Sequence, residues 1–402
     1  MTAPGSFLPY GHQSIDDDDV AAVVAALRGE FLTGGPTVVS FEQALCAATG
    51  ARHAVVCSSG TAGLHLAALA LGLGEGDVVI VPSLTFLATA NAARYVGAEV
   101  VFSDVDPETG LMRVQDLDDA LVQAASGGRR VKAVFPVHLN GQPADPAGIH
   151  DLARRHGLSI VEDASHALGT RYGNGAHSVG ACSHADATVF SFHPVKTATM
   201  AEGGAVTVSA PVLKERLARF RNHGMIREPE AFTELEQALD ASGQAHPWYY
   251  EMPEIGFNYR ATDLQCALGL RQMAKLDGFL ARRRALVARY DVLLADMAPL
   301  LRPVGRVAGA EAGWHLYVVH IRFDQLGRDR ATVMKQLRAE GIGTQVHYLP
   351  VHRQPYYRKR YGRISLPGAD AYYDQALSLP LYPDMTEADQ DRVVSALSRL
   401  VS

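Results

Sequence analysis

The sequence is poor in cysteine and has no long apolar run. Its four cysteines, Cys46, Cys57, Cys182 and Cys266, lack the C-x-x-C spacing of a zinc cluster and match no disulfide framework. No stretch of 18 apolar residues occurs, so no membrane-spanning helix is expected. Residues 1–10 show neither the basic region nor the apolar core of a signal peptide. These absences predict a cytoplasmic protein with reduced thiols, no membrane contact and no metal site.

An excess of positive charge is also absent. Lys and Arg number 37 against 43 Asp and Glu, which gives a formal net charge of −6 and argues against a nucleic-acid partner. With 48% hydrophobic and 20% charged residues, the composition is that of a packed globular protein and excludes disorder for most of the chain. The length of 402 residues exceeds what one compact core usually holds, so we expect two domains.

The first half of the chain alternates short β-branched runs with helical stretches. The runs predict strands at residues 53–58, 77–82, 99–104, 131–137, 159–164, 187–192 and 204–209. Helices are expected between the first five runs, at residues 63–71, 88–96, 114–125 and 147–156. This alternation predicts a mainly parallel sheet with helices on both faces. The last two runs are too close for a helical crossover, and we interpret them as an antiparallel or irregular pair that carries a functional loop.

The pattern changes near residue 252. One long helix, bent near residues 277–278, is expected over residues 262–295, with strands at 316–323 and 343–349 and helices at 329–340 and 387–401. We therefore divide the chain into two predicted domains. Residues 1–252 form an N-terminal arm and a large α/β domain, and residues 253–402 form a small α+β domain.

Ligands of such sheets bind at the carboxyl ends of the strands. The first predicted strand is followed by Ser58-Ser-Gly-Thr-Ala-Gly63, where small residues open a helix and expose N–H groups to an anion. This segment is a candidate phosphate cradle, although a glycine-rich helix start is more often only a cap. It matches neither G-x-G-x-x-G nor the P-loop pattern, so a nicotinamide-dependent oxidoreductase is not supported.

Three further side chains follow other strand ends. Phe86 follows the second run, where an aromatic ring could cover a flat cofactor or simply pack in the core. Asp163 ends the fifth run and requires a positive partner if buried. Lys196 follows the sixth run, and an amine with a lowered pKa can form a Schiff base, although a lone lysine is ordinarily a surface residue. A phosphate cradle, an aromatic ring, a carboxylate and a lysine at one sheet edge together indicate pyridoxal 5′-phosphate.

Nine short motifs carry a resemblance to a known family. They are Phe31-Leu-Thr-Gly-Gly-Pro36, Ser59-Gly-Thr61, Pro82-Ser-Leu-Thr-Phe86, His138-Leu-Asn-Gly141, Glu162-Asp163, Ser191-Phe-His-Pro-Val-Lys196, Glu202-Gly-Gly204, Gly256-Phe-Asn-Tyr-Arg260 and His347-Tyr-Leu-Pro350. The chain resembles the DegT-type nucleotide-sugar aminotransferases nearly from end to end. The resemblance implies the α/β fold type I of pyridoxal-phosphate-dependent transferases, with a seven-stranded, mostly parallel sheet between helices and a smaller C-terminal α+β domain.

The resemblance also implies a role for individual residues. Lys196 holds the cofactor as a Schiff base and shuttles the proton, and Asp163 pairs with the pyridine N–H. The other implied cofactor-binding residues are Phe86, which stacks on the ring, Thr61, Ala62 and Ser191 at the phosphate, and His166. Asn258 reaches the phosphate of the neighbouring subunit, so a homodimer with shared active sites is expected. Arg260 receives the carboxylate of the donor L-glutamate, because a guanidinium forms bidentate pairs.

One branch of the family is the most similar. His166 stands where most members carry Gln, and this position, residues 196–204 and residues 248–251 resemble the branch that aminates C4 of UDP-4-keto-6-deoxy-N-acetyl-β-L-altrosamine on the route to pseudaminic acid. Related members aminate C3 or C4 of other nucleotide-linked keto sugars. The expected substrate-binding residues are Thr33, Gly34, His193, Arg260, His347 and Tyr348, with His223 and His315 as further candidates.

Proteins that share this resemblance have two other functions, which we weigh against the aminotransferase. The 3-dehydratases of this family carry histidine in place of the Schiff-base lysine, and Lys196 argues against that reaction. A non-enzymatic pyridoxal-phosphate-binding regulator would be expected to carry a DNA-binding extension, and none is visible in the sequence.

Overall fold

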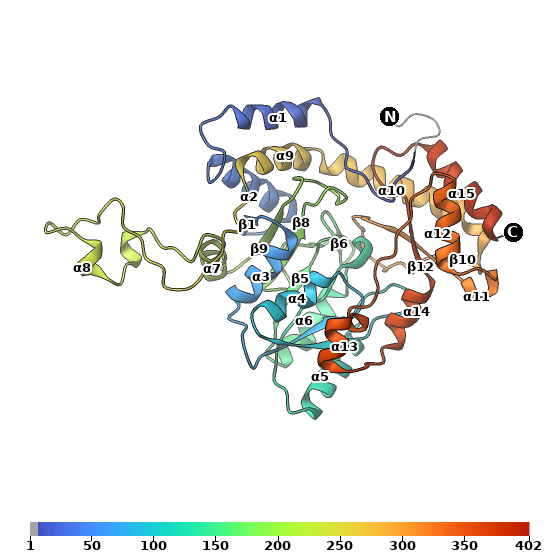
Figure 1. Cartoon of the computed structure of the whole chain (residues 1–402), viewed down its shortest axis with the longest axis horizontal. Helices are drawn as coiled ribbons and strands as arrows, with labels where there is room; N and C mark the ends of the chain where they lie inside the picture. The colour runs from blue at the N-terminus through green and yellow to red at the C-terminus, as the bar shows by residue number, and fades with distance from the viewer. Residues whose placement is uncertain (1–6, 402) are drawn as a thin grey trace.

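A seven-stranded sheet forms the centre of the molecule (Figure 1). The computed structural model describes residues 7–401, so residues 1–6 of the expected N-terminal arm lie outside the described range. The strands lie in the order β1 (His53–Cys57), β9 (Gly204–Val208), β8 (Ala187–Ser191), β5 (Ser159–Asp163), β4 (Val131–Val134), β2 (Val78–Pro82) and β3 (Glu99–Ser103). Strand β9 is antiparallel to both of its neighbours, and the other pairings are parallel. The predicted mostly parallel sheet, including its antiparallel final pair, is confirmed.

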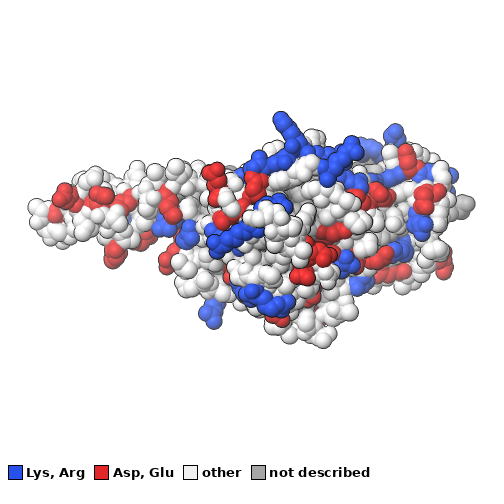
Figure 2. All heavy atoms as spheres, turned by 90° about the horizontal axis from the view of Figure 1, so that it is seen from below, with Lys and Arg blue, Asp and Glu red and all other residues white. Residues whose placement is uncertain are grey.

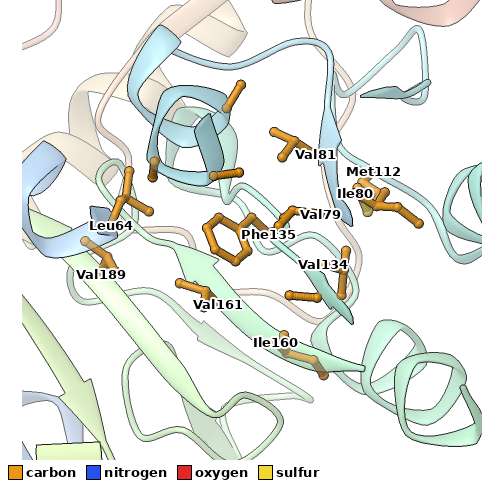
Figure 3. Close-up of a cluster of buried hydrophobic side chains, with 14 of the residues drawn as sticks. Leu64, Val79, Ile80, Val81, Met112, Val134, Phe135, Ile160, Val161 and Val189 are labelled. Carbon is orange, nitrogen blue, oxygen red and sulfur yellow. The ribbon is translucent and has the colours of Figure 1, made fainter. Parts of the chain in front are cut away.

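Helices cover both faces of this sheet. They are α2 (Pro36–Thr49), α3 (Gly60–Ala70), α4 (Leu87–Tyr95), α5 (Val114–Ser126), α6 (Pro146–Arg155) and α7 (Pro211–Arg221). Figure 3 shows the strand residues Val79 and Val161, and Phe135 directly after β4, packed together with Leu64 of α3, all of them fully or almost fully buried. Strands enclosed between helices are apolar on both faces, which is why these runs did not alternate in the sequence.

The C-terminal part builds a second, smaller core around a three-stranded antiparallel sheet. Its strands are β10 (Leu301–Pro303), β11 (Tyr317–Ile321) and β12 (Ala376–Leu379), and its main helices are α10 (Leu276–Leu293), α12 (Arg330–Ala339) and α15 (Glu387–Val401). The preceding helix, α9 (Asp263–Ala274), packs instead on α2 and on α1 (Asp17–Leu27). The predicted single long helix is broken at Lys275 rather than bent near residues 277–278. The smaller elements are β6 (Arg171–Tyr172), β7 (His177–Ser178), α11 (Phe323–Leu326), α13 (Pro355–Tyr361) and α14 (Pro367–Gln375).

The strand predicted at residues 343–349 is wrong. This segment touches a sheet only through one isolated bridge, Gln345 to Ser378. Its side chains at residues 345–348 line a cavity instead of extending a sheet. The division of the chain between residues 252 and 253 stays a prediction.

A long hairpin-like segment, residues 225–252 and here called the projection, leaves the body at the end of α7 (Figure 1). It carries the short helix α8 (Leu235–Ala238), and its exposed charges are mainly acidic (Figure 2). The carboxylate of Glu251 ties its two sides together by accepting hydrogen bonds from the backbone N–H groups of Thr233 and Glu234 and from two hydroxyls, those of Thr233 and Tyr249. Trp248 is 71% exposed there. The sequence analysis did not identify the projection.

The helices offer no membrane span. Among residues 7–401, no helix is both long and apolar enough to cross a bilayer.

Candidate active site

A cavity of about 570 Å³ opens at the carboxyl edge of the large sheet. The sheet edge forms its floor, and Tyr10 of the N-terminal segment and residues 345–348 of the C-terminal part form its walls. Ten of the predicted site residues line it: Thr61, Phe86, Asp163, His166, Ser191, His193, Lys196, His315, His347 and Tyr348. The structure therefore brings together residues from six strand ends and loops that are far apart in the sequence.

Lys196 lies in the turn that follows β8, where its backbone N–H donates to the carbonyl of His193 at 2.9 Å. Burial lowers the pKa of the amine from 10.5 to about 8, because desolvation disfavours the charged form, and the nearby carboxylate of Asp163 opposes this only in part. A substantial fraction of the amine is therefore unprotonated near neutral pH, as a nucleophile that attacks an aldehyde requires.

Asp163 ends β5 and is only 4% exposed. Its carboxylate accepts a hydrogen bond from the Thr89 hydroxyl at 2.7 Å and another from the backbone N–H of Ser165 at 3.1 Å. Both bonds fix the direction of the carboxylate without neutralising its charge. A cationic ring nitrogen placed in this cavity would supply the positive partner that a buried carboxylate needs.

The start of α3 forms the end of the site that is suited to bind an anion. Ser59 caps the helix, and its hydroxyl accepts the backbone N–H of Ala62 at 3.1 Å. Ala62 is thus engaged by the cap and does not line the cavity, whereas Thr61 and Ser191 do. A Cβ on Gly60 would lie 2.9 Å from the Cβ of Ser191, so the glycine is what allows the helix start to approach β8. A helix N-terminus beside two hydroxyls suits a phosphate group.

Phe86 stands at the N-cap of α4 with 53% of its surface exposed, although it is a large apolar side chain. Its ring lies 5.8 Å from that of Tyr348 across the cavity wall. An aromatic face left open at a cavity suits a flat, conjugated ligand. The lysine, the carboxylate, the helix start and this ring together fit pyridoxal phosphate.

Three histidines, His166, His315 and His347, lie side by side in the lining of the cavity and are here called the histidine wall. The backbone N–H of Asn140 donates to Nδ1 of His166 at 3.4 Å, so the ring proton of neutral His166 resides on Nε2 and is donated to the Tyr348 hydroxyl at 2.9 Å. Burial and the nearby Lys196 hold the pKa of His166 and of His315 well below the usual value. The same causes lower the pKa of His347 to about 3. This wall is therefore uncharged, and the hydroxyl proton of Tyr348 remains available for donation.

Six predicted site residues do not line the cavity of their own chain: Thr33, Gly34, Ala62, His223, Asn258 and Arg260. Thr33 pairs with Thr262 outside it, and Gly34 follows in an exposed turn with a φ of 70°. Asn258 is exposed in a loop that pairs with Asn222, whose side-chain oxygen also accepts a hydrogen bond from Arg260. The roles given to these residues stay predictions.

Comparison with known proteins identifies the family. The model of the DegT/DnrJ/EryC1/StrS aminotransferase family matches residues 13–398. The chain belongs to this family. The predicted family, enzyme class and fold are therefore confirmed, and the protein is a sugar aminotransferase of the DegT family.

Solved structures of sugar aminotransferases have the same fold over almost their whole length. Helicobacter pylori PseC, an aminotransferase involved in pseudaminic acid biosynthesis, is 27% identical with a TM-score of 0.87, covering 98% of this chain and 99% of its own. The putative sugar aminotransferase Spr1654 of Streptococcus pneumoniae, in its PLP form, is 26% identical with a TM-score of 0.85 and covers 98% of both chains. DesI, crystallised with its TDP-sugar product, is 31% identical with a TM-score of 0.84, covering 99% of this chain and 93% of its own.

Several residues of the aminotransferase cavity were missed by the sequence analysis. Tyr10 enters from the N-terminal segment, held by a hydrogen bond from the backbone N–H of Leu381 to its carbonyl at 3.0 Å. Gln345 and Thr85 also line the cavity. No local pattern distinguishes Tyr10 and Gln345, because contacts with distant parts of the chain bring them to the cavity. Thr85, in contrast, stands next to Phe86 in one of the family motifs at a predicted strand end.

Proposed function

We propose that the protein transfers an amino group from L-glutamate to C4 of a UDP-linked 4-keto-6-deoxy-N-acetyl-hexosamine, a reaction on the route to pseudaminic acid. The observation that carries the proposal is the position of Lys196 in a cavity that also holds the Asp163 carboxylate, the open ring of Phe86 and the start of α3. The similarity to PseC supports this substrate, and the similarity to DesI favours a second candidate, a TDP-linked keto sugar.

The cofactor is pyridoxal 5′-phosphate, which supplies an aldehyde and an electron-withdrawing ring when it is bound. Lys196 would hold the aldehyde carbon and, once the amine of the donor has displaced it, would carry the proton between the substrate carbon and the cofactor. Its pKa of about 8 suits both tasks, because the amine can give and take a proton near neutral pH. Asp163 keeps the ring nitrogen protonated and does not itself need to move.

The remaining contacts orient the cofactor. Thr61 and Ser191 bind the phosphate at the start of α3, and Phe86 covers one face of the ring. His166, fixed by Asn140, holds Tyr348 in place. Tyr348 donates its free proton to an oxygen of the bound sugar, and the uncharged histidine wall receives the hydroxyl groups of the sugar.

A second copy of the chain completes the site. In the loop of residues 256–260, Phe257 and Tyr259 pack inward on His65, with ring centroids 4.8 and 5.8 Å away. Because side chains of an extended segment alternate, Asn258 faces outward between them, and it is exposed. This direction suits a residue that serves the cavity of a partner subunit in a homodimer, and Arg260 on the same loop would meet the carboxylate of glutamate there.

The test is a substrate panel. The purified protein, loaded with pyridoxal phosphate and supplied with glutamate, is offered UDP- and TDP-linked keto sugars, and the aminated carbon is identified by NMR. Amination of the UDP-linked N-acetyl sugar at C4 is expected. Preference for a TDP-linked sugar, or amination at C3, would replace the proposed substrate while leaving the aminotransferase assignment intact.

A further inference from the structure

Arg283 of α10 is a buried cation without a carboxylate partner. Its side chain is 1% exposed, and no ion pair involves it among the described residues. One terminal nitrogen, Nη1, donates instead to three backbone carbonyls, those of Trp314 at 3.4 Å, His315 at 3.3 Å and Leu381 at 3.1 Å. Its Nε has no hydrogen-bond partner.

Such an arrangement costs free energy, because the guanidinium loses its hydration and gains no opposite charge. Desolvation lowers its pKa to about 10, which still leaves it protonated at neutral pH. A methionine would fill the same space without a buried charge. The guanidinium therefore has a role other than filling the core, and its three acceptors indicate that role.

All three acceptors belong to segments that reach the cavity. His315 lines the cavity, and its ring centroid lies 4.4 Å from that of His166. Leu381 follows β12, and its backbone N–H donates to the carbonyl of Tyr10, which lines the cavity beside His347 with the two ring centroids 5.3 Å apart. Arg283 thus joins the histidine wall to the N-terminal segment through two short chains of hydrogen bonds.

We propose that Arg283 is a positioning residue. It sets the distance between His315 of the histidine wall and the N-terminal segment that carries Tyr10, and with it the shape of the sugar-binding side of the cavity. Neither wall is otherwise fixed by regular sheet pairing, since Trp314 and His315 precede β11 and Leu381 follows β12. All three bonds come from one nitrogen, so a lysine, which keeps the charge and has three N–H donors on one nitrogen, can replace part of this arrangement.

The neighbouring Arg282 provides a matched control. It lies on the same helix and also donates to backbone carbonyls, those of Pro383 and Met385. Neither arginine lines the cavity itself, and neither acceptor of Arg282 lines it, whereas Arg283 bonds to His315, which does. The variants Arg283→Met, Arg283→Lys, Arg282→Met and Arg282→Lys are compared as full-length holoenzymes. Active sites are counted by mass spectrometry of borohydride-trapped cofactor, so that kcat and KM refer to loaded sites only.

This inference rests on the proposed function, because its main assay is amination of the nucleotide sugar. We expect Arg283→Met to lower kcat/KM per loaded site by about 10- to 100-fold, since small displacements of a positioned substrate have effects of that size. Arg283→Lys should recover part of the loss, and the Arg282 variants should keep the wild-type value even where their melting temperature falls.

Two results overturn the inference. One is a wild-type kcat/KM per site in Arg283→Met with a lowered melting temperature, which would make the arginine a stabilising residue only. The other is an equal loss in Arg282→Met, which would indicate general loosening of α10. If Arg283→Met yields no loaded protein, Arg283→Lys decides by the same comparison. If the wild type aminates none of the sugars, the proposed function is refuted instead. The variants are then compared by the rate at which pyridoxal phosphate attaches to Lys196. This rate should be lower only in the Arg283 variants.

Discussion

The charge of Asp163 controls the reactivity of Lys196, and this can be measured in the protein without its cofactor. Burial lowers the pKa of Lys196 to about 8, and the Asp163 carboxylate holds it above the value that burial alone would give. At pH 7 the unprotonated fraction of an amine rises from about 0.03% at a pKa of 10.5 to about 9% at a pKa of 8, roughly 300-fold. Asp163→Asn removes the charge at nearly constant volume, so it should lower the pKa of Lys196 further.

The assay is acylation of Lys196 with a soluble ester at pH 6–10, followed by peptide mass spectrometry. The labelling rate should reach half its maximum near pH 8 in the wild type and at a lower pH in Asp163→Asn. The midpoint for exposed lysines such as Lys359 should not change and serves as an internal control. A wild-type midpoint near 10.5, or a higher midpoint in Asp163→Asn than in the wild type, would refute the reasoning.

Three further predictions follow from the same geometry. Lys196→Ala should fold but lose transamination and borohydride-trapped cofactor, and trapped cofactor in this variant would contradict its role. A mixture of Lys196→Ala and Asn258→Ala dimers after subunit exchange should regain activity at about a quarter of the sites, measured by turnover, because one site of each mixed dimer is intact; no recovery despite proven exchange would place Asn258 in its own subunit's site. Gly204→Ala should destabilise the protein by more than about 2 kcal/mol in denaturant unfolding, because its Cβ would lie 2.2 Å from the Ser59 carbonyl group; an unchanged midpoint would show that α3 can shift.

The positions of the catalytic groups at strand ends could be predicted from the sequence. A buried parallel strand is a short apolar run, and a polar residue at its end stands out against that run. Asp163 and Lys196 were identified for this reason, and both line the cavity. The start of α3 was equally visible, because glycine and small hydroxyl residues mark a helix that begins close to another strand.

Predictions from local sequence patterns were wrong or absent where contacts between distant residues shape the chain. The sequence of residues 343–349 predicts a strand. In the structure, the side chains of residues 345–348 line the cavity, and only Gln345 pairs with a sheet. Tyr10 and Arg283 showed no signal, since their partners lie more than 30 positions away in the sequence. The projection was missed because its two sides are joined by a few contacts between residues far apart in the sequence, among them the carboxylate of Glu251 with Thr233 and Glu234 and the ring contact of Phe232 with Tyr249.

The sequence by itself determined the alternation of strands and helices in the large domain, the family and most of the residues that meet at the sheet edge, because each of these depends on short-range periodicity and on motifs of a few residues. The tertiary structure decided what surrounds them. It lowered the pKa of Lys196 by desolvation, kept the histidine wall neutral, and left Asn258 exposed and outside the cavity of its own chain. Burial and direction arise only when distant segments pack together, and no local pattern contains them.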